Sequence, residues 1–251
     1  YRQKCDFVTG EVFGDDWCNP GNAADKAPNV VLIGDSYSNS LGGMMETYTQ
    51  ANKGLLYEQY GRGQCPALLG YDPDWCAGFA QTVYERVKNT PSIKTVLIAG
   101  NWSYYWAEKK KFSATSRDYL RAEFEKSLRE TLKAYQGLGK RVVFVYQSPG
   151  LGDPKQCVQR RIRLGAGTED KCQLSLAEAQ TREEYRRFVT PLLAQLKIPA
   201  FDPYIHFCDT KSCKVRDGDK VFNTTITHLS GFGGQLLARK AAPELKKLLG
   251  Y

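Results

Sequence analysis

The chain has 251 residues, of which 42% are hydrophobic, so it can bury a sizeable core and is not a disordered segment. Its formal net charge of +8 comes from scattered lysines and arginines, which indicates a solvated basic face rather than a nucleic-acid site. No stretch is long and apolar enough to span a bilayer, and the first residues contain no signal-peptide core. We therefore expect a soluble piece, either a mature secreted protein or a domain of a membrane protein.

The chain begins with a polar segment and then becomes regular. Residues 1–28 are expected to be a lead-in tied by a disulfide, and residues 29–251 a single domain. Strand-like apolar runs cover 30–33, 55–60, 95–99, 142–146 and 200–204. Segments with a helical pattern cover 37–51, 78–89, 115–137, 173–196 and 231–249.

This alternation of strands and helices predicts the fold class. The runs at 30–33, 95–99 and 142–146 are continuous rather than alternating, as in parallel strands that are buried on both faces. We expect an α/β protein with three layers, in which helices cover both faces of a central parallel sheet of about five strands.

Ligands and chemistry collect at the carboxyl ends of the strands in such a sheet. The first strand ends in Gly34-Asp35-Ser36, and the second in Gly61-Arg62-Gly63. The third ends in Gly100-Asn101-Trp102, and the fourth in Gln147-Ser148-Pro149. Each of these residues also has an ordinary structural interpretation: Asp35 or Ser36 could cap the next helix, and Asn101 and Gly63 are common turn residues.

The order of these residues favours acyl transfer. A serine hydroxyl needs a base, usually histidine, and the chain contains only His206 and His228. Either histidine could be structural, but His228 comes just before the last helix, where it could serve as the base for Ser36. The backbone N–H groups of Ser36 and Gly63, with the Asn101 side chain, would then form an oxyanion hole.

The eight cysteines indicate an oxidising compartment, the periplasm or the exterior of the cell. Pairing of neighbours is the simplest of many schemes. It predicts four local disulfides: Cys5–Cys18, Cys65–Cys76, Cys157–Cys172 and Cys208–Cys213. With no Cys-x-x-Cys pair and only two histidines, no metal site is expected.

Aromatic residues follow Asn101 directly. Trp102 and Tyr105 could form a wall for a sugar acceptor, because aromatic faces pack against sugar rings. They could equally belong to the core or to a lid.

These motifs resemble those of the SGNH, or GDSL, hydrolase superfamily. The matching residues are Gly34-Asp35-Ser36, Gly100-Asn101 and His228-Leu229-Ser230. The segment from Asp202 to Ala238, with its two cysteines before the final histidine, resembles the SGNH domain fused to bacterial membrane acyltransferases of family 3, and "QCPALLG" from Gln64 to Gly70 is similar to a segment of those domains. The resemblance covers roughly residues 29–249 and implies a flavodoxin-like α/β/α SGNH fold.

The resemblance also implies residue roles. Ser36 matches the nucleophile, His228 the base and Asn101 the oxyanion asparagine. The oxyanion glycine is Gly63, with Gly61 as the alternative. Thr225 stands where the family usually has an aspartate, so we expect a backbone carbonyl to orient the second ring nitrogen of His228.

Such domains O-acetylate envelope polysaccharides or peptidoglycan without a cofactor. The resemblance implies that a membrane acyltransferase domain or partner delivers the acetyl group to a periplasmic domain, which is tethered to the inner membrane in the full-length protein. We expect the isolated domain to be a monomer that acts on a glycan and not on nucleic acid. Two alternatives stay open: a secreted carbohydrate or acetyl esterase, and a catalytically weakened glycan-binding domain.

Overall fold

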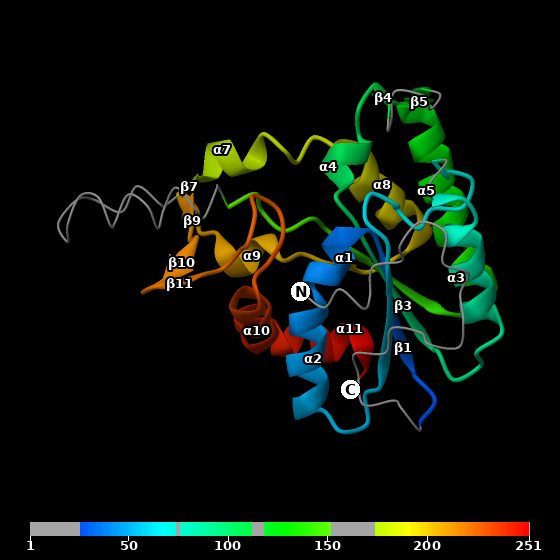
Figure 1. Cartoon of the computed structure of the whole chain (residues 1–251), viewed down its shortest axis with the longest axis horizontal. Helices are drawn as coiled ribbons and strands as arrows, with labels where there is room; N and C mark the ends of the chain where they lie inside the picture. The colour runs from blue at the N-terminus through cyan, green and yellow to red at the C-terminus, as the bar shows by residue number, and fades with distance from the viewer. Residues whose placement is uncertain (1–25, 74–75, 112–117, 152–173, 251) are drawn as a thin grey trace.

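The structure is a computed structural model that describes residues 26–73, 76–111, 118–151 and 174–250. Its centre is a parallel sheet of five strands in the order β2-β1-β3-β6-β8 (Figure 1). The strands of this sheet are β1 (Val30–Gly34), β2 (Tyr57–Gly61), β3 (Thr95–Ala99), β6 (Arg141–Val145) and β8 (Ala200–Phe201).

Helices cover both faces of the sheet. Along β1, Val30 and Leu32 point into one apolar cluster, whereas Val31 and Ile33 point into the other. The first cluster is covered by α2 (Gly42–Ala51), α10 (Gly231–Lys240) and α11 (Ala242–Leu249). The second is covered by α3 (Phe79–Lys88), α5 (Arg121–Gly137) and α8 (Arg186–Leu196). Figure 1 shows α2 and α10 on the opposite side of β1 and β3 from α3 and α5, and the expected three-layer α/β/α fold is confirmed.

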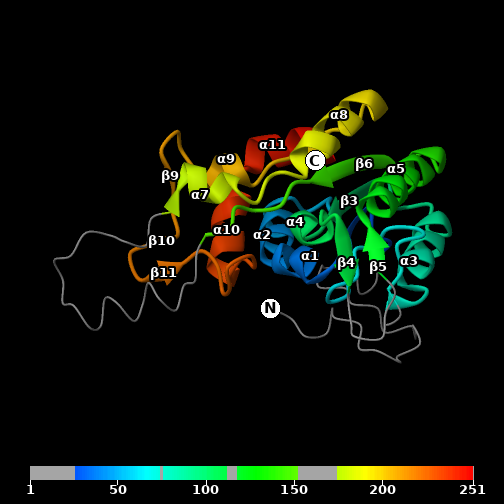
Figure 2. The same ribbon diagram turned by 90° about the horizontal axis from the view of Figure 1, so that it is seen from above.

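Shorter elements extend from the carboxyl end of the sheet. The short helices of the described residues are α1 (Ser36–Ser40), α4 (Trp102–Tyr105), α7 (Leu176–Gln180) and α9 (Tyr204–Phe207). Three small antiparallel pairs join β4 (Lys109–Lys111) to β5 (Asp118–Leu120), β7 (Leu174–Ser175) to β9 (Ser212–Cys213), and β10 (Arg216–Asp217) to β11 (Lys220–Val221). Figures 1 and 2 both show α7, α9 and the pairs β7–β9 and β10–β11 together at one side of the sheet.

Several predicted elements are divided in the structure. The helix expected over 37–51 is two helices that meet at Leu41. The helix expected over 231–249 ends at Lys240, because Pro243 lies in the first turn of a new helix and has no N–H to continue the old one. The strand expected over 200–204 has only two residues, since Pro203 starts the turn into α9.

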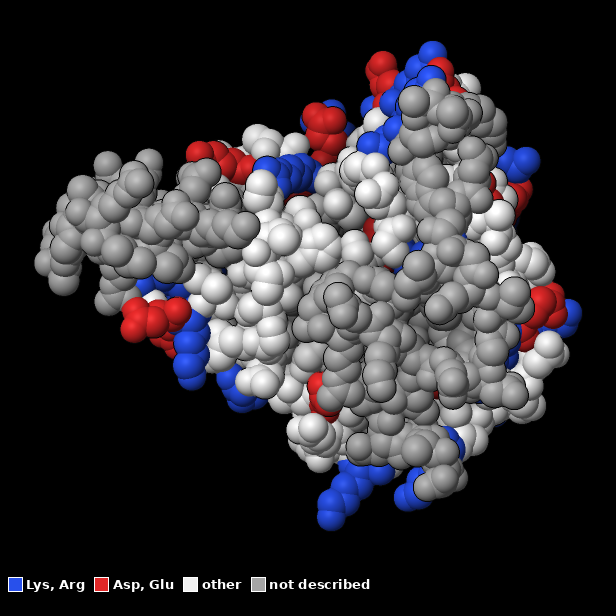
Figure 3. Space-filling model, viewed as in Figure 1, with Lys and Arg blue, Asp and Glu red and all other residues white. Residues whose placement is uncertain are grey.

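The described part of the surface carries dispersed charge. Figure 3 shows lysines and arginines around the outline of one face, with aspartates and glutamates among them. No helix within the described residues is both long and apolar enough to cross a membrane.

Candidate active site

The register of the sheet brings the predicted site residues to one edge. Gly34 of β1 pairs with Gly61 of β2 on one side and with Ala99 of β3 on the other. Ser36, Gly63 and Asn101 each follow one of these paired residues by two positions. Since the strands are parallel, all three leave the sheet at the same end.

The backbones of β1 and β3 are too close at this point for a side chain. A Cβ on Gly34 would lie 1.7 Å from the Ala99 carbonyl oxygen, and Gly34 has a φ of +154°. The first glycine of the Gly-Asp-Ser triplet is therefore required by packing, and it permits the sharp exit that places Ser36 at the start of α1.

Asp35, and not Ser36, caps the helix. Its side chain accepts a hydrogen bond of 2.7 Å from the Tyr37 N–H. Ser36 is the first residue of α1, where a backbone N–H has no partner within the helix. The capping role, which the sequence left open between the two residues, thus falls on Asp35, and Ser36 stays the candidate nucleophile.

The Asp35 carboxylate also joins the first and third strand exits. Its second oxygen accepts from the Asn101 N–H at 2.9 Å and from the Tyr105 hydroxyl at 2.7 Å. Burial raises the pKa of Asp35 to about 6, although these hydrogen bonds oppose the rise. Asp35 therefore fixes Asn101 relative to Ser36, a role that sequence reasoning missed.

Ser36 and His228 are in direct contact. The Oγ of Ser36 lies 2.8 Å from Nε2 of His228, across 192 residues of sequence. This distance is suited to proton transfer from a hydroxyl to an imidazole nitrogen. The Tyr37 ring lies beside the pair, with its centroid 6.3 Å from that of His228.

A closed loop presents His228 to Ser36. The Thr224 N–H donates to the His228 carbonyl at 2.8 Å, and the Ser230 N–H donates to the Phe222 carbonyl at 2.9 Å. Ser230 then caps α10, whose first turn is rich in glycine.

Those glycines allow α10 to approach its neighbours closely. A Cβ on Gly233 would lie 1.9 Å from the Phe222 carbonyl oxygen, and one on Gly234 would lie 2.9 Å from the Met44 nitrogen in α2. Because α2 follows α1 closely in the chain, this contact holds the His228 loop next to the exit of β1.

Among the described residues, threonine hydroxyls contact the second ring nitrogen of His228. The Oγ1 of Thr225 lies 2.9 Å from Nδ1, and that of Thr227 lies 3.2 Å from it. Where we expected a backbone carbonyl, the loop folds the Thr225 side chain back over the ring: the same hydroxyl accepts from the His228 N–H at 3.2 Å.

A hydroxyl fixes the imidazole less firmly than a carboxylate does. It can accept from Nδ1–H, which leaves Nε2 free to take the Ser36 proton, or it can donate to a bare Nδ1, which blocks that step. The Thr225 oxygen already faces the N–H groups of Thr227, at 3.4 Å, and His228. These contacts compete with acceptance from Nδ1–H.

The surroundings of Asn101 and Gly63 leave groups of both residues available for the expected role of oxyanion donor. The Oδ1 of Asn101 accepts from the Ser103 hydroxyl at 3.2 Å, so the amide NH₂ is the end that remains to bind a ligand. Gly63 lies in a turn closed by the Cys65 N–H and the Arg62 carbonyl at 3.0 Å. A Cβ on Gly63 would meet nothing within 4 Å.

Gly61 has a different position from Gly63. It is the last residue of β2 and is buried, and a Cβ there would lie 1.9 Å from Oδ1 of Asn39. Packing explains why Gly61 is a glycine, whereas Gly63 follows the strand and faces open space. We therefore retain Gly63 as the candidate donor.

Trp102 and Tyr105 do not form an acceptor wall. Both are fully buried in the core, at 0% and 1% exposure. The Trp102 indole N–H donates to the Val145 carbonyl at 2.8 Å, while the Tyr105 hydroxyl holds Asp35. The short helix α4 turns both rings inward, which adjacency to Asn101 in the sequence does not reveal.

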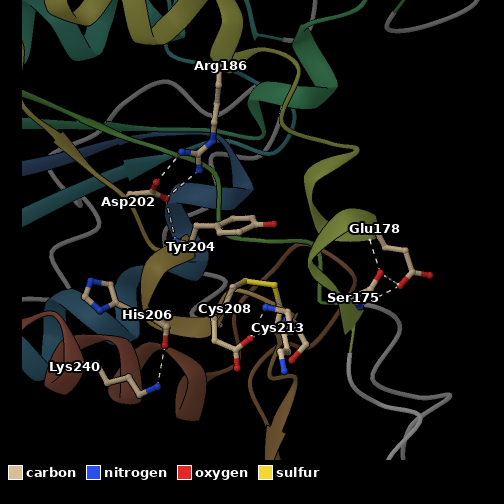
Figure 4. The surroundings of a disulfide bond; sticks show 12 residues. Ser175, Glu178, Arg186, Asp202, Tyr204, His206, Cys208, Cys213 and Lys240 are labelled. Atoms are coloured by element: carbon tan, nitrogen blue, oxygen red, sulfur yellow. Dashed lines mark hydrogen bonds and ion pairs between the residues drawn. A yellow bond between two sulfur atoms is a disulfide. The ribbon is translucent and has the colours of Figure 1, made fainter.

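The other histidine has a structural partner. His206 lies on α9, and its Nε2 is 2.9 Å from a carboxylate oxygen of Glu244 on α11. Its backbone carbonyl accepts from the Lys240 ammonium at 2.8 Å (Figure 4). His206 thus joins α9 to the two last helices.

Two of the four predicted disulfides lie within the described residues, and both are present. Cys65–Cys76 anchors the turn that contains Gly63, and Cys208–Cys213 closes the segment after α9 (Figure 4). The predicted bonds Cys5–Cys18 and Cys157–Cys172, and nearly all of the lead-in segment, fall outside the described residues.

Comparison with known proteins gives a consistent family and fold. The model of the family described as "SGNH domain (fused to AT3 domains)" matches residues 4–243. No curated protein matches the sequence. Among solved structures, the periplasmic domain of a lipopolysaccharide acetyltransferase from Salmonella ser. Paratyphi A is similar with a TM-score of 0.65 and 17% identity, over 87% of this chain and 84% of that one.

Two esterases share the fold at lower similarity. A carbohydrate acetylesterase from Sinorhizobium meliloti has a TM-score of 0.52 and 12% identity, over 88% of this chain and 99% of that one. An aryl esterase from M. smegmatis has a TM-score of 0.51 and 14% identity, over 88% and 100% of the two chains.

Proposed function

Because the chain belongs to the family of SGNH domains fused to AT3 domains, we propose that it is a serine-dependent acyltransferase that moves an acetyl group to a hydroxyl of a cell-envelope glycan. The observation that carries this proposal is the 2.8 Å contact between Oγ of Ser36 and Nε2 of His228. It pairs a nucleophile with a base at the carboxyl edge of the sheet.

The first half-reaction forms an acetyl-enzyme. Oγ of Ser36 attacks the carbonyl carbon of the acetyl donor while its proton passes to Nε2 of His228. The tetrahedral intermediate then collapses, the bond to the leaving group breaks, and His228 returns the proton to that group. Ser36 now carries the acetyl group as an ester.

The second half-reaction transfers the acetyl group. A sugar hydroxyl attacks the Ser36 ester, and His228 removes the hydroxyl proton. The intermediate collapses, the bond to Oγ breaks, and the proton moves from His228 to Ser36. The products are the acetylated sugar and the free enzyme. Over the two half-reactions one acetyl group moves from the donor to the sugar, and no cofactor is needed.

The negative charge on the carbonyl oxygen of both tetrahedral intermediates needs hydrogen-bond donors to stabilise it. The N–H groups of Ser36 and Gly63 and the Asn101 side-chain amide are proposed to supply them. Asp35 contributes as a positioning residue, since it binds the Asn101 N–H at 2.9 Å.

The Salmonella structure supports a place in the cell envelope. Its description is that of the periplasmic domain of a lipopolysaccharide acetyltransferase, and the family is described as fused to AT3 domains. We propose that this chain likewise works in the periplasm and receives its acetyl group from a membrane acyltransferase domain. The two disulfides in the described residues are compatible with an oxidising compartment.

One observation favours a second function, a catalytically weakened glycan-binding domain. Thr225 contacts His228 where the related domains usually have an aspartate, and a hydroxyl brings no charge to stabilise the imidazolium. An esterase would use the same acetyl-enzyme with water as the acceptor.

Product analysis separates acetyl transfer from hydrolysis. The chain is incubated with p-nitrophenyl acetate and a set of methyl pyranosides, and acetate and acetylated sugar are both quantified by mass spectrometry. Acetylated sugar formed by the wild type and absent with Ser36→Ala supports transfer. Acetate alone indicates an esterase, and turnover that survives Ser36→Ala would remove the proposed nucleophile.

A further inference from the structure

Four helices in the described part of the chain begin after Asp, Asn or Ser, the residues that most often cap a helix with their own side chains. Asp35 caps α1, Ser175 caps α7 and Ser230 caps α10, each by accepting from a backbone N–H of the first turn. Asn101 has the same position before α4, but its side chain makes no such hydrogen bond. The first turn of α4 therefore has to find its acceptor elsewhere.

Gln147, at the exit of β6, supplies this acceptor. Its Oε1 accepts from the Ser103 N–H at 3.0 Å, which is one of the bonds that a capping side chain normally makes. Gln147 is fully buried, and its backbone N–H donates to the Tyr185 hydroxyl at 3.0 Å. The side chain that caps α4 thus comes from the exit of another strand and is held there by its surroundings.

A neighbouring contact fastens α4 to the same strand. The Trp102 indole N–H donates to the Val145 carbonyl at 2.8 Å, and the Trp102 ring stacks on Phe144 with the centroids 4.9 Å apart. Two successive residues of α4, Trp102 and Ser103, are therefore tied to β6 and its exit.

The cap from Gln147 leaves the Asn101 side chain available to the candidate site. Oδ1 of Asn101 accepts from the Ser103 hydroxyl at 3.2 Å, while the Ser103 N–H is bonded to Gln147. The backbone of Asn101 has a ψ of 70°, whereas a residue that caps with its side chain usually has extended backbone. Its N–H donates to Asp35 at 2.9 Å, so Asn101 is held next to Ser36 without using its amide NH₂.

We propose that Gln147 is a positioning residue, which caps α4 in place of Asn101 and so keeps the Asn101 amide directed at the oxyanion. Without Gln147, the Ser103 N–H would lose its acceptor, at a cost in free energy. Oδ1 of Asn101, which already contacts Ser103, would then rotate to cap its own helix and would take the amide NH₂ with it. The inference rests on the proposed function for the role of the amide, whereas the cap itself can be tested without turnover.

Kinetics test the positioning role. Gln147→Met keeps the length of the side chain and removes the amide acceptor. With p-nitrophenyl acetate it should lower kcat about tenfold, less than the usual loss for deleting an oxyanion donor, and change KM by less than about twofold. In an Asn101→Ala background the same replacement should lower kcat by less than about twofold, because Gln147 acts through Asn101. The control is Ser175→Ala, which removes the cap of another short helix and should leave kcat unaltered.

Hydrogen exchange, followed by NMR, tests the cap without any reaction. The Ser103 N–H should exchange slowly in Asn101→Ala, where Gln147 accepts, and also in Gln147→Met, where Asn101 accepts. In the double variant neither acceptor remains, and this N–H should exchange at least about tenfold faster than in either single variant.

The wild-type chain allows a test that does not depend on the folding of any variant. A scalar coupling across the hydrogen bond should join the Ser103 backbone nitrogen to the side-chain carbonyl carbon of Gln147. A coupling to the side-chain carbonyl carbon of Asn101 instead would overturn the inference.

The outcomes distinguish this inference from the proposed function. Slow Ser103 exchange in both single variants and fast exchange in the double variant, without Ser36-dependent turnover in the wild type, would support the cap and contradict the acyltransferase. An unchanged kcat in Gln147→Met, or an equal loss of kcat in both backgrounds, would overturn the positioning role. Exchange in Gln147→Met as fast as in the double variant would also overturn it, because Asn101 would not have moved to the cap.

Discussion

The side-chain hydroxyl of Thr225 lies 2.9 Å from Nδ1 of His228, on the far side of the imidazole from Ser36. Related domains usually place an aspartate at this point, and a carboxylate both selects the Nδ1–H tautomer and stabilises the imidazolium. The hydroxyl does not select one tautomer firmly, because it can donate as well as accept. It also carries no charge that could stabilise the imidazolium.

Replacing Thr225 with aspartate should therefore speed the reaction. We expect Thr225→Asp to raise kcat for p-nitrophenyl acetate about tenfold, because a charge replaces a dipole beside Nδ1. Thr225→Ser keeps the hydroxyl and should stay within about twofold of the wild type. A folded Thr225→Asp chain with a lower kcat than Thr225→Ser would contradict this account of the tautomer.

Removing the Asn101 side-chain amide should lower kcat rather than raise KM. Its amide is the only side-chain group among the proposed oxyanion donors, so Asn101→Ala should lower kcat by about 100-fold, the usual loss for one such donor. KM should change little, since the donor acts on charge that develops in the transition state. Steady-state kinetics with p-nitrophenyl acetate provide the measurement. Ser103→Ala, which removes only the hydroxyl that binds Oδ1 of Asn101, should have a smaller effect, and equal losses in the two variants would contradict the assignment.

Asp35 should give stability a distinct dependence on pH. Its pKa is about 6 in the folded chain against an ordinary value of 3.8, so the folded state binds the proton more tightly. This contribution is fully present below pH 3.8 and is lost as the pH rises through 6. The difference of about two units corresponds to about 3 kcal/mol.

Asp35→Asn removes that titration. Urea unfolding of both chains from pH 4 to pH 7 should show the stability of the wild type, relative to the variant, falling by about 2.4 kcal/mol over this range. Stability curves that run parallel across the same range would show that Asp35 does not titrate near pH 6.

The two glycines at the exit of β2 should respond differently to alanine. Gly61→Ala places a Cβ 1.9 Å from Oδ1 of Asn39 and should lower the free energy of unfolding by about 1–3 kcal/mol. Gly63→Ala meets nothing within 4 Å and retains its N–H, so stability should change by less than about 0.5 kcal/mol. Thermal or chemical unfolding of the matched pair measures this contrast, and equal losses would contradict the packing argument.

The sequence predicted the parts of the molecule that depend on local pattern. Continuous apolar runs predict buried parallel strands, and the order of strands then places Ser36, Gly63 and Asn101 at one edge. The candidate pair of Ser36 and His228 followed from the small number of histidines. The predicted positions of strand ends and helix breaks were less accurate, because these positions depend on packing between elements. The break at Leu41 is an example.

Features that depend on side-chain direction could not be predicted. Trp102 and Tyr105 follow Asn101 in the sequence, yet α4 turns them into the core. The Thr225 hydroxyl contacts Nδ1 only because the loop closes on itself. The cap that Gln147 gives to α4 joins the exits of β3 and β6, which come from segments without a shared motif.

The most direct test of the central claim is to trap the acetyl group on Ser36. The wild-type chain is mixed with p-nitrophenyl acetate, quenched with acid within milliseconds to seconds, digested and analysed by mass spectrometry. We predict a gain of one acetyl group on the peptide that contains Ser36, blocked in Ser36→Ala and strongly reduced in His228→Ala because the two residues act as a unit. Acetyl found on another residue while Ser36 stays unmodified, or acetylation of Ser36 that is undiminished in His228→Ala, would contradict the proposed site.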